Sequence, residues 1–146
     1  MTPEDVRGGV PLLVDTDVFS FVHTQRGPWE DFVPFLKHRV LAVSFVTVAE
    51  VWYGARKDNW GEKKCKALEL SIGAHLQIAP DVRVSMRWAD VARECLGQLS
   101  GDKEAHDLWI ASCALVFELP LVTNNLGDFQ VIAVKFAGLE LVHPSL

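Results

Sequence analysis

The chain has 146 residues, of which 49% are hydrophobic, and a formal net charge of −5. This length and composition suit one compact domain with its own core. The negative charge argues against a simple DNA- or RNA-binding module, because such modules present a basic surface to phosphates. No apolar run approaches the roughly 20 residues that a membrane-spanning helix needs.

The start of the chain and its cysteines exclude further classes. The first nine residues lack the basic and apolar segments of a secretory signal peptide, so we expect a cytoplasmic protein with residues 1–9 as an N-terminal extension. Cys65, Cys95 and Cys113 are odd in number, widely spaced and without a Cys-x-x-Cys pair. They predict neither a disulfide framework nor a zinc site, and we expect them to be small core residues.

Strand-like and helix-like segments alternate along the chain. Short apolar runs typical of buried strands lie at residues 10–14, 40–43, 75–79, 121–123 and 139–142. The spacing of apolar side chains between them predicts helices at residues 18–24, 29–37, 45–57, about 58–72, 81–99, 104–118 and 129–136. This alternation predicts an α/β fold: a single domain over residues 1–146, with a central, mostly parallel sheet of four to five strands and helices on both faces.

The first predicted strand ends on a carboxylate. Its apolar run stops at Asp15-Thr16-Asp17, and Thr16 or Asp17 is expected to cap a helix that begins near Val18. Ligands bind at the carboxyl ends of strands in open α/β sheets, so Asp15 is placed at a candidate site. Asp15 and Asp17 are equally consistent with ordinary turn and cap residues.

Three further acids lie beside elements that the sequence predicts to be buried. Glu50 stands in an otherwise apolar helix turn, Asp107 opens the most hydrophobic helix, and Asp128 follows the fourth strand. A carboxylate is costly to bury without a cation, and few lysines or arginines are near these positions in the sequence. Together with Asp15 they predict a site for a hard divalent ion, Mg²⁺ or Mn²⁺. Singly, each has a structural explanation, such as a helix cap at Asp128 or a helix-dipole contact at Asp107.

Four segments contain these acids and other polar residues at fixed spacing. They are Leu12-Leu13-Val14-Asp15-Thr16-Asp17-Val18-Phe19, Ser44-x-x-Thr47-x-x-Glu50-x-x-x-Gly54, His106-Asp107-x-x-Ile110-Ala111-x-x-Ala114 and Leu121-Val122-Thr123-x-Asn125-x-x-Asp128-Phe129. In this order and spacing they resemble the PIN-domain family, and within it the VapC-type toxins of toxin–antitoxin pairs, over almost the whole chain. The resemblance implies a small, metal-dependent endoribonuclease that forms a homodimer and is neutralised by a separately encoded antitoxin.

The resemblance also implies roles for individual residues. Asp15, Glu50 and Asp107 match the three central acids of the family. At the fourth position this chain has Asn125, where some members have Asp, and Asp128 follows three residues later. The fourth ligand is therefore either Asp128 or Asn125, and the number of metal ions stays open.

The resulting hypothesis is hydrolysis of RNA phosphodiester bonds by a metal-activated water. Asp15 and Asp107 would be the principal ligands, and the other acids would complete the shell or position the attacking water. Three more residues are secondary candidates. Glu104, one helical turn before Asp107, would belong to the acidic rim, whereas Thr16 and Thr123 would bind the phosphate or hold the carboxylates.

Two alternatives remain. Asp15-Thr16-Asp17 also resembles the signature of haloacid-dehalogenase-type phosphatases, with Asp15 as nucleophile and Asp17 as general acid/base. The domain could instead be a non-catalytic PIN-like module that binds RNA or protein. The remaining acids favour Asp15 alone in the pocket and Asp17 as a helix cap. We expect RNA as substrate, an antitoxin and a second copy of the chain as partners, and no membrane association.

Overall fold

Thirteen short elements make up the chain, and the computed structural model describes all of its residues, 1–146. The strands are β1 (Leu12–Val14), β2 (Leu41–Ser44), β3 (Leu76–Ile78), β4 (Leu121–Val122) and β5 (Leu141–Val142). The helices are α1 (Thr16–Thr24), α2 (Trp29–Leu36), α3 (Phe45–Lys57), α4 (Glu62–Gly73), α5 (Val82–Cys95), α6 (Glu104–Phe117) and α7 (Leu126–Lys135), preceded by a single 3₁₀ turn, η1 (Pro3–Asp5). None of the helices is both long and apolar enough to cross a membrane.

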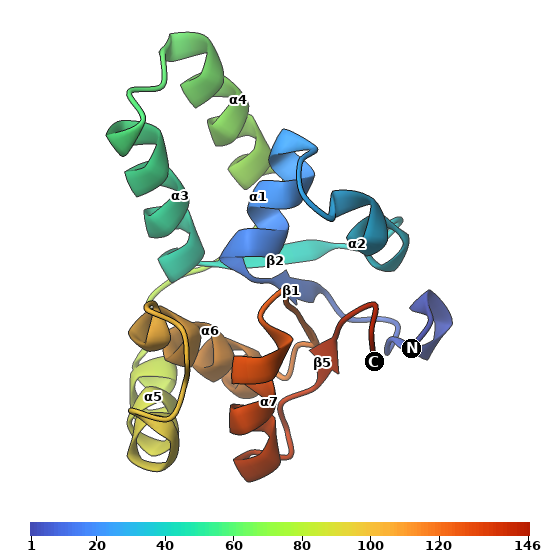
Figure 1. Cartoon of the computed structure of the whole chain (residues 1–146), viewed down its shortest axis with the longest axis vertical. Coiled ribbons are helices and arrows are strands. Elements are labelled where there is room, and N and C mark those ends of the chain that lie inside the picture. The colour runs from blue at the N-terminus through green and yellow to red at the C-terminus, as the bar shows by residue number, and fades with distance from the viewer.

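The elements form three layers (Figure 1). The strands form one sheet in the order β3-β2-β1-β4-β5, and every neighbouring pair is parallel. Helices α1 to α4 cover one face of the sheet, and α5 to α7 cover the other. The predicted α/β class, the parallel sheet of five strands and the helices on both faces are confirmed.

The central strand β1 joins the two halves of the core. Leu13 packs among the residues of α5, α6 and α7, whereas Leu12 and Val14 pack among those of α1 to α4. Successive side chains of a strand point to opposite faces, and helices cover both faces here. This explains why the sequence of β1 is continuously apolar, and it leaves Asp15 as the first residue beyond the buried strand.

Helix α1 begins earlier than expected because its cap is a different residue. The Asp15 Oδ1 accepts a hydrogen bond from the Val18 amide at 2.8 Å, so Asp15 is the N-cap and Thr16 already belongs to the helix. The expected cap at Thr16 or Asp17 is therefore wrong. The cap predicted for α3 is confirmed, since the Ser44 hydroxyl accepts from the Thr47 amide at 3.2 Å.

Two other helix boundaries also differ from the prediction. Helix α5 ends at Cys95 instead of residue 99, because the chain turns at Gly97, whose φ is 86°. Helix α7 begins at Leu126 instead of residue 129, so that Asp128 lies in its first turn and is not its cap.

The buried helix α6 was recognised from its apolar sequence. Its buried residues are Leu108, Ile110, Ala111, Ser112, Cys113 and Ala114. Cys95 and Cys113 are core residues as expected, Cys65 is half-buried, and all three cysteines are free. Packed between the sheet and α5, α6 presents its N-terminal turn, with Asp107, at the carboxyl edge of the sheet.

Candidate active site

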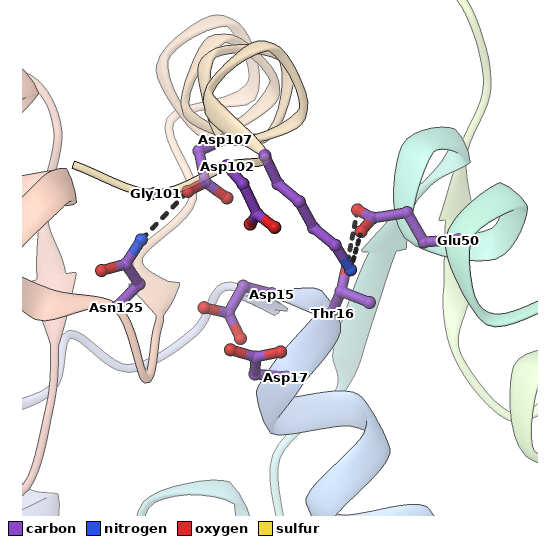
Figure 2. A pocket seen from close by; sticks show the side chains of 9 residues that line it. Asp15, Thr16, Asp17, Glu50, Gly101, Asp102, Asp107 and Asn125 are labelled. Atoms are coloured by element: carbon purple, nitrogen blue, oxygen red, sulfur yellow. Dashed lines mark hydrogen bonds and ion pairs between the residues drawn. The ribbon is translucent and has the colours of Figure 1, made fainter. Parts of the chain in front are cut away.

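A polar pocket of about 110 Å³ lies at the carboxyl edge of the sheet. No hydrophobic residue lines it, and its volume suits several water molecules or a hydrated ion. The lining residues are Asp15, Thr16, Asp17, Glu50, Gly101, Asp102, Lys103, Asp107 and Asn125. Figure 2 shows the carboxylates of Asp15, Asp17 and Asp102 directed toward one another across this space.

Asp15 is the most deeply buried acid of the pocket, with 4% of its surface exposed. Besides capping α1, it accepts hydrogen bonds at Oδ2 from the Thr123 hydroxyl at 2.7 Å and from the Asn124 amide at 3.1 Å. Burial raises the pKa of Asp15 to about 7, because no cation offsets the lost hydration and the three hydrogen bonds only partly do so. The carboxylate is rigidly held, and its negative charge is poorly compensated.

Asp107 enters the pocket from the first turn of α6, opposite Asp15. The Asn125 amide group donates to its Oδ2 at 3.0 Å. Burial, together with the negative charges of nearby acids (Glu50, Asp128 and Asp17), raises the pKa of Asp107 to about 6. Like that of Asp15, the negative charge of Asp107 is not balanced by a nearby cation.

Glu50 has a different environment, although its side chain is only 10% exposed. Its Oε2 lies 3.3 Å from the Lys103 ammonium and 3.4 Å from Nδ1 of His106. Its Oε1 accepts a hydrogen bond from the Thr16 hydroxyl at 2.9 Å. The Thr16 oxygen lies 3.0 Å from that of Thr47, and since Thr16 donates its one proton to Glu50, Thr47 donates to Thr16. Glu50 is thus already paired with a cation of this chain.

The two candidate threonines hold carboxylates. Thr16 holds Glu50, and the fully buried Thr123 donates to Asp15 while it accepts from the Asn125 amide at 2.8 Å. Of the two functions predicted for them, fixing the carboxylates is the one that these contacts support.

Asp128 and Glu104 lie outside the pocket lining and bind the backbone of residues 97–101. Asp128 accepts from the amide and hydroxyl of Ser100 at 2.9 and 2.8 Å, from the Gly101 amide at 3.0 Å and from the Asn125 side chain at 3.0 Å. Burial raises the pKa of Asp128, but these hydrogen bonds outweigh it and hold the pKa below its ordinary value. Glu104 accepts from the amides of residues 97 and 99, each at 2.9 Å.

Of the two candidates for the fourth ligand, Asn125 is the one that lines the pocket. Its side-chain amide donates to both Asp107 and Asp128, and its carbonyl oxygen makes no hydrogen bond within the chain. A carbonyl oxygen is a suitable ligand for a hard cation. The structure thus places Asp15, Glu50, Asp107 and Asn125 around one space and Asp128 behind it.

Four lining residues, Gly101 among them, were not predicted from the sequence to belong to the metal site. Asp17, expected to be a cap outside the pocket, is exposed and lines it. Asp102 and Lys103 line it from the loop that precedes α6. Asp102 and Lys103 could have been predicted from their place in the sequence. They directly precede the helix that carries Asp107, and that loop must pass the same edge of the sheet.

The donor set fits a hard divalent cation in its chemistry. Carboxylate and amide oxygens dominate the lining. The buried Asp15 and the half-buried Asp107 lack a cation partner, and the pKa of both is raised. No three His, Cys, Asp or Glu side chains converge closely enough to form a ready-made metal site. Ligation would therefore require side-chain movement, or contact through the waters that Mg²⁺ usually retains.

Comparisons with known proteins agree with this geometry. A family model described as PIN domain matches residues 12–135. Ribonuclease VapC2 of Haemophilus influenzae is 29% identical over 127 residues, which cover 84% of this chain and 93% of that protein. Ribonuclease VapC1 of the same species is 28% identical over 125 residues, covering 82% and 90%.

Solved structures agree as well. VapBC-1 from nontypeable Haemophilus influenzae contains a chain with a TM-score of 0.73 and 25% identity, matched over 94% of this chain and 100% of that one. DNA-bound VapBC from Salmonella typhimurium contains one with a TM-score of 0.73 and 22% identity, matched over 92% and 98%. The second likeness shows the fold alone.

Proposed function

Because the chain belongs to the PIN-domain family, we propose that it is a metal-dependent endoribonuclease and the toxin of a toxin–antitoxin pair. One observation carries the proposal: Asp15, Glu50 and Asp107, which are far apart in the sequence, line one pocket without hydrophobic residues. The similarity to ribonucleases VapC2 and VapC1 supports RNA as the substrate.

The residues of the pocket have distinct parts in this proposal. Asp15 and Asp107 would hold Mg²⁺ or Mn²⁺, with the carbonyl oxygen of Asn125 and the carboxylate of Glu50 as further donors. When bound, the ion supplies charge neutralisation for the phosphate and a lowered pKa for a coordinated water. Thr123 fixes the orientation of Asp15, and Asn125 that of Asp107. The polar lining leaves space in which water, the nucleophile of a hydrolysis, can approach the phosphate.

The test is RNA hydrolysis by the purified, antitoxin-free protein with Mg²⁺ or Mn²⁺. We expect Asp15→Ala and Asp107→Ala each to lower the rate by on the order of 10²- to 10⁴-fold, and a chelator to abolish it, because charge neutralisation at the phosphate is lost. Asp90→Ala, which removes an exposed acid on α5, is the matched control and should retain the rate. Hydrolysis that persists in the chelator, or in both pocket variants, would contradict the mechanism.

Partners follow from the same similarity. Solved complexes of similar fold include VapBC pairs, and those from Rickettsia felis and Salmonella typhimurium are bound to DNA. We propose that this chain also binds a small antitoxin and forms a homodimer. Co-expression with an antitoxin encoded by a small open reading frame next to the gene, where one is found, should give a co-purifying complex that no longer hydrolyses RNA. Sedimentation of the isolated chain should give about twice its 16.3 kDa mass, and a monomer would contradict the homodimer.

The phosphatase alternative has one point in its favour, because Asp15 and Asp17 both line the pocket. However, both oxygens of Asp15 accept hydrogen bonds in its role as cap and strand-end residue, and the family match is to PIN domains. The two functions separate by substrate. The proposed ribonuclease leaves phosphomonoesters intact, whereas a phosphatase hydrolyses them and loses this activity in Asp17→Asn.

A further inference from the structure

Lys103 is the only basic residue that lines the acidic pocket. It immediately precedes α6, and its side chain is 61% exposed, whereas the Glu50 side chain to which it pairs is 10% exposed. The ammonium therefore reaches from the solvent side of the pocket to a largely buried carboxylate. Neither the predicted metal shell nor the mechanism above uses this group.

The pairing divides the pocket into two electrostatic halves. Glu50 has Lys103 at 3.3 Å and the imidazole of His106 at 3.4 Å. Asp15 and Asp107 have no basic side chain in contact, and burial raises the pKa of both. An incoming divalent ion gains most where negative charge is uncompensated, which is the half formed by Asp15 and Asp107. In the half formed by Glu50, the Lys103 ammonium already balances the charge of the carboxylate.

The five carboxylates of the pocket repel RNA, because each phosphate carries a negative charge, so every cation in the pocket favours its approach. A single divalent ion still leaves the pocket with excess negative charge. The Lys103 ammonium sits on a flexible four-carbon stem, in the position from which it can contact a phosphate oxygen that enters the pocket.

We propose that Lys103 is a substrate-binding residue of this site, whose ammonium pairs with Glu50 in the free protein and contacts an RNA phosphate in the complex. The proposal rests on the ribonuclease function proposed above and deepens it. Glu50 then positions Lys103, and the metal ion is held mainly by the opposite half of the pocket. A lysine that exchanges one anionic partner for another loses little Coulomb energy in the exchange.

The test measures RNA binding in a chelator, where no RNA is consumed. A fluorescent, short single-stranded RNA is titrated at several salt concentrations with the unsubstituted chain, Lys103→Met and Lys103→Arg. Loss of one phosphate contact should weaken binding by Lys103→Met about three- to tenfold and lower the slope of log affinity against log salt by about 0.7, whereas Lys103→Arg keeps both. The matched control is Lys37→Met, which removes an exposed lysine that precedes β2 and therefore lies at the opposite edge of the sheet.

A second measurement separates substrate binding from a structural role. Mn²⁺ titrated into RNA-free Lys103→Met should bind at least as tightly as to the unsubstituted chain, because the ammonium no longer competes for Glu50. Weaker Mn²⁺ binding would overturn the proposal, and so would an unchanged RNA affinity and salt slope. The two proposals can fail separately. A chain that binds RNA through Lys103 without hydrolysing it would contradict the proposed ribonuclease activity but not the role of Lys103.

Discussion

Asp15 combines two roles with opposite electrostatic preferences. As the N-cap of α1 it accepts the Val18 amide, and a helix N-terminus favours the ionised carboxylate. Its burial beneath the pocket favours the neutral acid, and burial has the larger effect, so that its pKa rises to about 7. The capping hydrogen bond fixes the position of the carboxylate. Because no basic side chain is paired with it, a bound cation would stabilise its ionised form.

This residue predicts how stability depends on pH without metal. The pKa of Asp15 rises from its ordinary 3.8 to about 7 in the folded chain. Between these values the folded state binds more protons than the unfolded state, so this group lowers the free energy of unfolding as pH rises from about 4 to about 7. In the unsubstituted chain, this group should lower the free energy of unfolding by on the order of 1 to 4 kcal/mol between pH 4 and pH 7. We expect Asp15→Asn to abolish this decrease, because the amide does not titrate.

The measurement is urea unfolding in a chelator at several pH values. Burial lowers the pKa of His23, His75 and His143, and these groups act in the opposite direction at acid pH. The informative quantity is therefore the difference in unfolding free energy between Asp15→Asn and the unsubstituted chain. Asp90→Asn on the exposed face of α5 is the control. A difference that does not change with pH would show that Asp15 is not the titrating group.

At the scale of elements, the loop before α6 is held in place by two acids that the sequence suggested for the metal shell. Asp128 binds Ser100 and Gly101, and Glu104 binds the amides of Gly97 and Leu99. There is little free space at this contact, because a Cβ added at Gly101 would lie 3.1 Å from the Asp128 carboxylate. The loop carries Asp102 and Lys103 into the pocket, so these acids position pocket residues from behind.

We therefore expect Asp128→Ala to loosen the loop while the protein still binds Mn²⁺. Loss of hydrogen bonds to a buried, ionised acceptor should cost about 2 to 4 kcal/mol of stability. Hydrogen exchange at the Ser100 and Gly101 amides should become faster, and kcat should fall more than Mn²⁺ affinity. Glu69→Ala, from a surface ion pair on α4, is the control. If Mn²⁺ binding is lost while the loop amides stay protected, Asp128 belongs to the metal shell after all.

At the scale of the whole molecule, the site is a product of the sheet and the helices on both of its faces. Asp15 follows the central strand, Glu50 comes from α3 on one face, and Asp107 comes from α6 on the other. An ion that these acids share would connect both halves of the core. Metal binding should consequently stabilise the whole fold and not a local segment.

The corresponding prediction concerns thermal unfolding with and without Mn²⁺. At about 100 times the dissociation constant, a ligand specific for the folded state adds about 2.7 kcal/mol, which for a chain of this size raises Tm by about 10 °C. The double variant Asp15→Ala, Asp107→Ala should show no such rise, because the half of the pocket without its own cation is removed. An equal rise in Tm for the double variant would place the ion elsewhere.

The sequence by itself determined the layered α/β fold and the three acids at the centre of the site. Apolar runs and helical spacing follow from burial on both faces of a parallel sheet, so β1 and the buried α6 are readable without coordinates. Asp15, Glu50, Asp107 and Asp128 stood out because each interrupts or borders such a buried run, and the resemblance to PIN domains marked the first three as the central acids. These signals are local in the chain.

Only the tertiary structure decided what each polar residue contacts. Asp15 lines the pocket as expected and is also the cap of α1, whereas Asp17, expected to be the cap, lines the pocket. Asp128 turned toward residues 100 and 101, and Lys103 reached Glu50. These partners are separated by about 30 to 50 residues, and hydrogen bonds and ion pairs depend on distances of a few ångströms, which no periodic pattern in the sequence records.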